Sequence, residues 1–355
     1  MPAEWEPHRA TYLVWPHNRA TWPGKFDAIP PVFARLAAAI ASFEPLRILI
    51  ATEHDAEEIR RMIGLAGEAS GERGDGAAVL ERVELVAVAT NDSWIRDHGP
   101  IFVNRADSGT PGQIALDWRF NSWGEKYGAF DLDDATPRRL AERYGFEVAA
   151  TGIVLEGGSI DVDGEGTLLT TESCLLNPNR NPTMNRREIE DALKEWLGVS
   201  AVLFLGEGIA GDDTDGHVDD LARFVAPGTV VTVVENDPGD ANYRALEENL
   251  TRLGAMRDAA GRRLRIERLP MPPALFHEGI RVPASYANFY ILNDGVIVPT
   301  FGCAADDEAL TTIGRLFPGR RVVGIPSTDL VWGLGAVHCL TQQHPVAPTG
   351  GGLGE

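Results

Sequence analysis

A helical pattern followed by a short apolar strand recurs along this chain, and that recurrence restricts the fold more than any other feature. It is first clear at Val32–Phe43, a helical run that ends at Glu44-Pro45 and leads into the apolar run Leu46–Ala51. The same order predicts helices at Thr136–Tyr144, Asn185–Leu197, Ala241–Leu253 and Asp306–Phe317, and strands at Phe146–Ala149, Ala201–Leu205, Leu264–Leu269 and Arg321–Ile325.

Pairs of short strands around turn residues lie between these segments. Ser159–Val162 and Thr167–Thr171 flank one turn, and Phe289–Leu292 and Val296–Pro299 flank another. A unit of hairpin strands, a helix and a further strand therefore appears about five times. We predict an α/β fold in which repeated units surround a common axis, with one domain over residues 1–345 and a flexible C-terminal tail at 346–355. A doubly wound sheet with separate domains is the alternative.

Charge and cysteine usage exclude several classes of protein. The formal net charge of −20 argues against nucleic-acid binding, which depends on Lys and Arg, and suits a small cationic substrate. No apolar run approaches about 18 residues, so we expect no membrane span and a cytoplasmic location. The three cysteines, Cys174, Cys303 and Cys339, form no CxxC pair, which leaves room for one catalytic thiol. Whether copies of the chain form a homo-oligomer stays open.

Cys339 is the candidate nucleophile. It follows two glycines and a short apolar run and precedes the amides Gln342 and Gln343. Small neighbours allow close approach of a flat substrate to the sulfur. An inert buried cysteine is the alternative. The adjacent His338 would point to the opposite face if the segment is a strand, so adjacency does not make it the base.

Polar residues next to glycine mark further candidates at expected strand ends. Trp94 and Asp97 could hold a planar cation between an indole face and a carboxylate, although an ordinary surface turn would look the same. Glu156 ends an apolar strand at Gly157-Gly158, where a buried acid needs a partner. His217 and Asp219, two residues apart, would point to one side of an extended segment. The acids around His217 match neither the EF-hand pattern nor HExxH, so we predict no metal site.

Taken together, these stretches resemble the agmatine deiminase and bacterial-type peptidylarginine deiminase family. The resemblance runs nearly the full chain, and its specificity lies in the order of the motifs. They are Met1–His8, Trp94–Pro100, Asp117–Gly124, Glu156–Gly158, Gly216–Asp219, Tyr286–Tyr290 and His338–Gln343. The fold implied by this resemblance is the pentein propeller, with five ββαβ-like units around a pseudo-fivefold axis.

The resemblance also implies how a guanidinium would be held. Asp97 and Asp219 would bind its N–H groups in bidentate fashion, and Trp94 would line the pocket. Trp123 and Arg119 would belong to the substrate-binding residues. Arg119 could pair with a substrate carboxylate, which agmatine lacks and a C-terminal arginine has, and a structural salt bridge is the other reading of the same residue.

The chemistry implied by the resemblance is covalent and uses no metal or organic cofactor. Cys339 would attack the guanidinium carbon as a thiolate. His217 would protonate the leaving ammonia and then activate water to hydrolyse an S-alkylthiouronium intermediate, and Glu156 would orient His217.

We therefore expect an agmatine deiminase that forms N-carbamoylputrescine and ammonia for polyamine (putrescine) synthesis. Deimination of arginine in peptides, preferably at the C-terminus, is the first alternative. A non-catalytic binder of cationic ligands with an inert Cys339 is the second, and a zinc or calcium hydrolase is the third.

Overall fold

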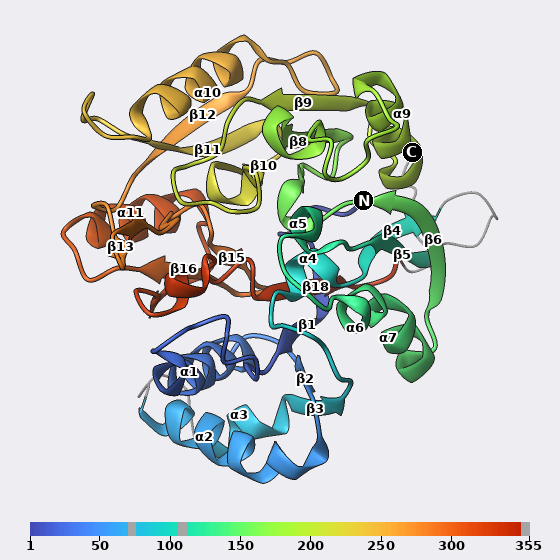
Figure 1. The fold of residues 1–355 in the computed structure, drawn as a ribbon, viewed down its shortest axis with the longest axis vertical. Coiled ribbons are helices and arrows are strands. Elements are labelled where there is room, and N and C mark those ends of the chain that lie inside the picture. The colour runs from blue at the N-terminus through green and yellow to red at the C-terminus, as the bar shows by residue number, and fades with distance from the viewer. Residues whose placement is uncertain (70–75, 106–111, 349–355) are drawn as a thin grey trace.

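The computed structural model of the chain describes residues 1–69, 76–105 and 112–348 and has a mixed α/β architecture. Within these ranges the strands form four three-stranded sheets, one four-stranded sheet and one two-stranded sheet. The principal helices lie on the outside of the molecule and the sheets on the inside (Figure 1). None of the helices in these ranges is both long and apolar enough to cross a bilayer.

Each three-stranded sheet is built from the same unit: an antiparallel pair of strands, an outer helix, and a strand that returns parallel to the second. A parallel return needs a crossover, and a helix with one apolar face covers the sheet while it crosses. The four units are β4 (Ile101–Arg105), β5 (Gly112–Arg119), α7 (Thr136–Tyr144) and β6 (Glu147–Val154); β7 (Asp161–Val162), β8 (Thr167–Thr171), α9 (Arg186–Leu197) and β9 (Ala201–Leu205); β10 (Ala222–Ala226), β11 (Thr229–Val234), α10 (Tyr243–Ala255) and β12 (Arg265–Pro270); and β15 (Tyr290–Ile291), β16 (Gly295–Thr300), α11 (Ala305–Leu316) and β17 (Arg321–Pro326).

The four-stranded sheet joins the beginning of the chain to its end. Its order is β18 (Thr341–Pro345), β1 (His8–Val14), β2 (Leu46–Ile50) and β3 (Val83–Ala87), with α1 (Ile29–Ala41), α2 (Ala56–Ala69) and α3 (Gly76–Glu81) outside it. The antiparallel register of β18 on β1 places Leu13 opposite Thr341 and Thr11 opposite Gln343. Strands β1 and β18 lie side by side (Figure 1). The turn directly before β18, which carries Cys339, therefore lies close to the N-terminal segment.

Short elements complete the chain. Four-residue helices are α4 (Ile95–His98), α5 (Ser122–Glu125), α6 (Asp131–Asp134) and α8 (Glu172–Leu175); turns of 3₁₀ helix are η1 (Phe26–Ala28), η2 (Glu53–Asp55), η3 (Gly157–Ser159), η4 (Val218–Asp220) and η5 (Leu330–Gly333); and the two-stranded sheet is β13 (Phe276–His277) with β14 (Ile280–Arg281). Several of these short elements carry the candidate site described below.

The predicted position of the helix α9 is confirmed, and the residues at its two ends explain why. Asn185 and Glu188 form a capping box at its start, and Gly198 ends it in the left-handed conformation with φ of 66°. Ile189, Leu193 and Leu197 repeat every four residues and form one buried stripe. Local sequence therefore decides both ends of this helix and the face that it turns to the sheet.

The predicted strand Ser159–Val162 is wrong at its beginning. Residues Gly157–Ser159 form η3, and the strand β7 contains only Asp161 and Val162. The Ser159 hydroxyl donates to the carbonyl of Glu156 at 2.6 Å, a local bond that competes with strand pairing. Of the predicted tail at 346–355, residues 349–355 lie outside the described residues.

His344 links two sheets and gives the fold a predicted sensitivity to acid. Its ring stacks on Phe102 with centroids 4.1 Å apart, and burial together with the positive charge of Arg47 lowers its pKa to about 3. At pH 5 the folded protein keeps this ring neutral, whereas a histidine in the unfolded chain, with a pKa of about 6.5, takes up a proton. Lowering the pH from 7.5 to 5 should therefore reduce the free energy of unfolding by about 2 kcal/mol through this residue.

Urea unfolding at both pH values measures this effect. The His344→Gln variant should lose that part of the pH dependence, and His54→Gln, at an exposed position, should keep it. Equal pH dependence in wild type and His344→Gln would contradict the prediction.

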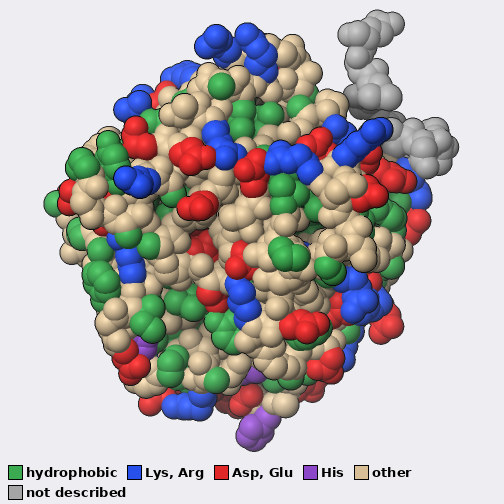
Figure 2. Space-filling view, turned by 45° about the horizontal axis from the view of Figure 1, so that its top comes forward, with side chains coloured by type: hydrophobic (Ala, Val, Ile, Leu, Met, Phe, Trp, Pro, Cys, Tyr) green, Lys and Arg blue, Asp and Glu red, His purple; other side chains and the backbone are tan. Residues whose placement is uncertain are grey.

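Figure 2 shows side chains of both charges over one face of the molecule, with Asp and Glu side chains near the middle of the view. The excess of acidic residues, 52 Asp and Glu against 32 Lys and Arg, makes the protein as a whole attractive to cations.

Candidate active site

Three predicted site residues from two segments, Asp97 from α4 and His217 with Asp219 from η4 and the residue before it, converge on Gly158 in η3. A Cβ atom built on this glycine would lie 2.6 Å from His217 Nδ1, 2.9 Å from Asp97 Oδ1 and 3.0 Å from Asp219 Oδ2. Only a residue without a side chain leaves room for these groups to approach one another. The fold therefore assembles an imidazole and two carboxylates around one backbone position.

Asp97 is held on both of its oxygens. It lies in α4, and the N–H of Gly158 donates to its Oδ1 at 3.0 Å. The indole Nε1 of Trp123 donates to its Oδ2 at 2.9 Å. Burial raises the pKa of Asp97, and the positive charge of His217 offsets the shift only in part. A cation bound beside Asp97 would favour its ionised form.

Asp219 lies in η4 beside the candidate nucleophile. Its Oδ2 is 3.8 Å from Cys339 Sγ, and its Oδ1 is buried with no hydrogen-bond partner among the described residues. An unpaired buried carboxylate oxygen is a free acceptor for the N–H groups of a guanidinium. His217 precedes η4, so the predicted extended segment from His217 to Asp219 is wrong, although both side chains reach the surroundings of Gly158.

Cys339 is buried, and its thiol is held in the protonated form in the absence of a ligand. Burial, with the negative charges of Asp219, Asp220 and Asp97, raises its pKa well above the ordinary value. The side-chain amide of Asn288 donates to the sulfur at 3.1 Å and to Asp220 at 3.0 Å. A positive charge is therefore required before this sulfur can act as a thiolate near neutral pH.

His217, in contrast to the neutral Cys339 thiol, is held in its charged form. Burial alone would lower its pKa, but the negative charge of Asp97, whose Oδ1 is 3.7 Å from His217 Nδ1, and further contributions from Cys174 and Glu156 raise it well above the ordinary value. Neither ring nitrogen has a hydrogen-bond partner in the part of the chain that the structure describes. The site thus holds a buried imidazolium that can give up a proton.

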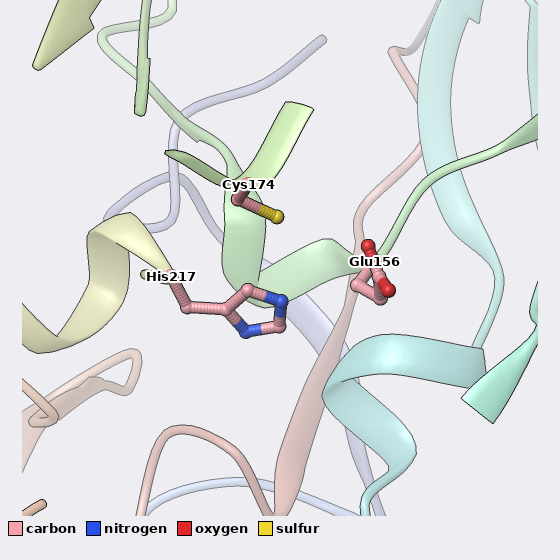
Figure 3. Close-up of side chains that lie close together, drawn as sticks. All are labelled: Glu156, Cys174 and His217. Atoms are coloured by element: carbon pink, nitrogen blue, oxygen red, sulfur yellow. The ribbon is translucent and has the colours of Figure 1, made fainter. Parts of the chain in front are cut away.

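Glu156 lies close to His217 and is fixed by Arg180. The guanidinium Nε of Arg180 donates to Glu156 Oε1 at 2.8 Å, and both side chains are fully buried. One Glu156 oxygen, one His217 ring nitrogen and Cys174 Sγ lie within 4.8 Å of one another (Figure 3). The sequence analysis missed Arg180 and Cys174, because no local pattern marks either of them as part of a site.

His338 lies in a turn rather than in a strand, and its ring faces the site. Its Nδ1 is 2.7 Å from Asp219 Oδ2, and its Nε2 is 2.8 Å from Glu4 Oε2. Each ring nitrogen of His338 therefore contacts one carboxylate oxygen. The segment is not a strand, so the condition under which His338 would point to the face opposite Cys339 is not met. His338 holds Asp219 in place and leaves Asp219 Oδ1 free.

The N-terminal Glu4 anchors this arrangement. Burial alone would raise its pKa, but Arg223, His338 and Arg96 bring it well below the ordinary value. Arg223 Nη2 is 2.9 Å from Glu4 Oε1, and Arg96 Nη2 is 3.3 Å from Glu4 Oε2. The sequence contained no signal for this network beyond the acidic residue in the motif Met1–His8.

The aromatic candidates and Arg119 have different surroundings. Trp94 is buried and its ring is so close to Gly335 that a Cβ on this glycine would lie 2.5 Å from the indole. Trp123 is buried against Asp97. The side chain of Arg119 is 56% exposed and its Nε donates to Asp134 Oδ1 at 3.1 Å. Arg119 therefore has the structural salt bridge that the sequence left open, and its contact with a substrate stays a prediction.

The family described as Porphyromonas-type peptidyl-arginine deiminase matches residues 1–345 of this chain. An agmatine deiminase of Stutzerimonas stutzeri is 38% identical over 97% of this chain and 95% of its own length. An agmatine deiminase of Pseudomonas aeruginosa is likewise 38% identical, with 97% and 95% of the two chains covered.

Solved structures agree with these sequence matches. The structure of an agmatine deiminase of Enterococcus faecalis has a TM-score of 0.86 at 35% identity and covers 97% of this chain and 95% of that chain. A Cys-to-Ser variant of the agmatine deiminase of C. jejuni, with substrate bound, has a TM-score of 0.84 at 28% identity and covers 98% and 96% of the two chains.

Proposed function

This chain belongs to the Porphyromonas-type peptidyl-arginine deiminase family, and we propose that within it the protein is an agmatine deiminase. It is a hydrolase that acts on the C–N bond of a guanidino group. The proposed reaction converts agmatine and water into N-carbamoylputrescine and ammonia, and it would supply polyamine synthesis.

One observation carries the proposal: Cys339 Sγ lies 3.8 Å from Asp219 Oδ2 within a group of buried carboxylates. Buried acids without enough cations of their own attract a cation, and the free Asp219 Oδ1 is an acceptor for N–H groups. A guanidinium held by Asp97 and Asp219 has its carbon within reach of the sulfur.

The binding of the substrate would itself activate the nucleophile. Negative neighbours raise the pKa of the Cys339 thiol, and a guanidinium cation placed between Asp97 and Asp219 opposes that effect. The thiol proton then leaves to solvent, and the thiolate forms a bond to the guanidinium carbon.

His217 would serve as the acid and then as the base. Its imidazolium gives a proton to the departing amino group, so that ammonia leaves and an S-alkylthiouronium remains on Cys339. The neutral ring then takes a proton from water as the water oxygen attacks the same carbon. The C–S bond breaks, the hydroxyl proton returns to the sulfur, and the ureido product leaves.

Asp97, Asp219 and Trp94 would bind the guanidinium, with Trp123 holding Asp97 in position. Glu156 would stabilise the charged form of His217. We also propose that the repeated units form the five-unit pentein propeller and that residues 1–345 are a single domain. A cytoplasmic location stays a prediction of the sequence.

A panel of guanidines tests the substrate assignment. Ammonia release should be faster from agmatine than from free arginine or from a peptide with C-terminal arginine, by about 100-fold or more in kcat/KM. The reason is that each of the other two carries a carboxylate, and Arg119, its predicted partner, is already paired with Asp134. A higher kcat/KM for the arginyl peptide would favour peptidylarginine deimination, for which the exposure of Arg119 is the supporting observation. Release from none of the three would favour the non-catalytic binder.

A further inference from the structure

Cys174 is a second buried thiol beside the catalytic histidine, and the reaction proposed above gives it no role. It lies in α8 and is fully buried. Its Sγ, one His217 ring nitrogen and one Glu156 carboxylate oxygen all lie within 4.8 Å of one another (Figure 3). A thiol, an imidazole nitrogen and a carboxylate oxygen therefore lie around a common point, between His217 and Glu156.

The polar atoms at this point lack partners. Both ring nitrogens of His217 and Oε2 of Glu156 are buried with no hydrogen bond to any described residue. Leaving such atoms unsatisfied is unfavourable, so a ligand that satisfies more than one of them at once is favoured. A metal ion accepts lone pairs from a thiolate, an imidazole and a carboxylate together.

We propose that Glu156, Cys174 and His217 form an inhibitory binding site for a divalent ion of the zinc class. Zinc takes these three donors at about 2.0–2.3 Å, so shifts of up to about 0.8 Å per side chain bring separations of up to 4.8 Å to bonding distance. The thiolate selects zinc or cobalt over magnesium or calcium, which prefer oxygen ligands.

The surroundings hold two of the ligands in position. The Thr171 hydroxyl donates to the carbonyl of Gly216 at 2.5 Å and accepts from the N–H of Cys174 at 3.3 Å. This one hydroxyl links the backbone of Cys174 to that of the residue before His217. Arg180 fixes Glu156 through Oε1 and leaves Oε2 free. Supporting contacts of this kind orient metal ligands.

Charge balance permits a dication, because its two charges replace those of the two protons released on binding and the net charge of the cluster stays the same. Asp97 lies 3.7 Å from the His217 ring and Asp219 lies on the same side, whereas Arg180 is already neutralised by Glu156 and Asp215. On binding, the Cys174 thiol and the His217 imidazolium each lose one proton to solvent, and metal–sulfur and metal–nitrogen bonds form in their place.

Occupation would stop the reaction because the lone pair of His217 would be bound to the metal and the ring could no longer carry a proton. The inhibition depends on the proposed role of His217, whereas metal binding does not depend on which guanidine is the substrate. Binding and inhibition are therefore measured separately.

Cobalt(II) is the probe for binding. Titration of the metal-free protein should give an absorption band for thiolate-to-cobalt charge transfer at one equivalent, and zinc should abolish it by competition. Cys174→Ser should remove the band and weaken cobalt binding by about 100-fold or more. This loss is larger than that typical for a residue that only supports a metal ligand. Cys303→Ser is the matched control: this half-buried thiol hydrogen-bonds to Tyr286 at 3.2 Å, away from the cluster, and its loss should leave the band unchanged.

A second variant keeps the test decisive if Cys174→Ser does not fold. In the double variant Cys303→Ser and Cys339→Ala, Cys174 is the one thiol of the chain, because the sequence has three cysteines. The cobalt band must persist there. Its loss in the double variant, or its persistence in folded Cys174→Ser, would overturn the site.

Inhibition is measured as the rate of ammonia release at increasing zinc concentration. The rate of each protein is divided by its own rate without metal. The zinc concentration for half inhibition should rise by about 100-fold or more in Cys174→Ser and stay the same in Cys303→Ser. Equal zinc sensitivity of the two variants would overturn the inhibitory role. If agmatine is not hydrolysed, the cobalt result still decides the site, so failure of the proposed function and failure of this inference are distinguishable.

Discussion

Replacement of Cys339 by alanine is expected to lower the rate of ammonia release from agmatine by about 10⁴-fold or more. Without the sulfur no covalent intermediate forms, and loss of a nucleophile in a comparable catalytic group has an effect of this order or larger. The measurement is ammonia release at saturating agmatine for wild type and Cys339→Ala. Undiminished release would contradict the thiol mechanism.

The binding of agmatine separates chemistry from folding in this variant. The carboxylates Asp97 and Asp219 remain, so Cys339→Ala should still bind agmatine in a calorimetric titration. Cys303→Ser, which alters a half-buried thiol elsewhere, should keep wild-type activity.

Alkylation of the wild type by iodoacetamide adds a second readout. Because burial and the neighbouring carboxylates raise the pKa of the Cys339 thiol, its labelling should be slow at pH 7 and faster as the pH rises, and bound guanidine should protect it sterically. Rapid labelling at pH 7 without a ligand would contradict the assigned protonation state.

Replacement of Gly158 by alanine is expected to reduce kcat/KM for agmatine by about 100-fold or more. The new methyl group would lie 2.6 Å from His217 Nδ1 and 2.9 Å from Asp97 Oδ1, so at least one of these groups must move. A displacement of about 1 Å at reacting groups is enough for a loss of this size. The backbone of Gly158 does not have the positive φ that only glycine tolerates, so the variant should fold.

Gly254→Ala is the matched control. This glycine lies in α10, and a Cβ atom there has no neighbour within 4 Å. Its replacement should leave kcat/KM unchanged and stabilise the protein by about 0.5–1 kcal/mol, because alanine favours a helix over glycine. If Gly158→Ala has full activity and wild-type thermal stability, the reaction does not take place at the groups around Gly158.

The sequence by itself determined several of the helices and strands and the kind of chemistry. The helix at Thr136–Tyr144 and the strand at Ala201–Leu205 have the predicted bounds, because caps, breakers and apolar spacing act over a few residues. The order of the motifs also identified the family, whereas the residues that would bind and attack a guanidinium stay predictions.

Only the tertiary structure decided which side chains meet. Asp219 and His338 are 119 residues apart and Glu4 and His338 are 334 apart, yet their side chains are in hydrogen-bond contact. Such distances depend on how whole units pack and on the pairing of β18 with β1, which no local pattern encodes. For the same reason the sequence contained no signal for the partnership of Arg180 with Glu156 or for the thiol of Cys174 beside His217. Propensity and periodicity act between near neighbours in the chain, whereas a buried polar site is made by contacts between distant ones.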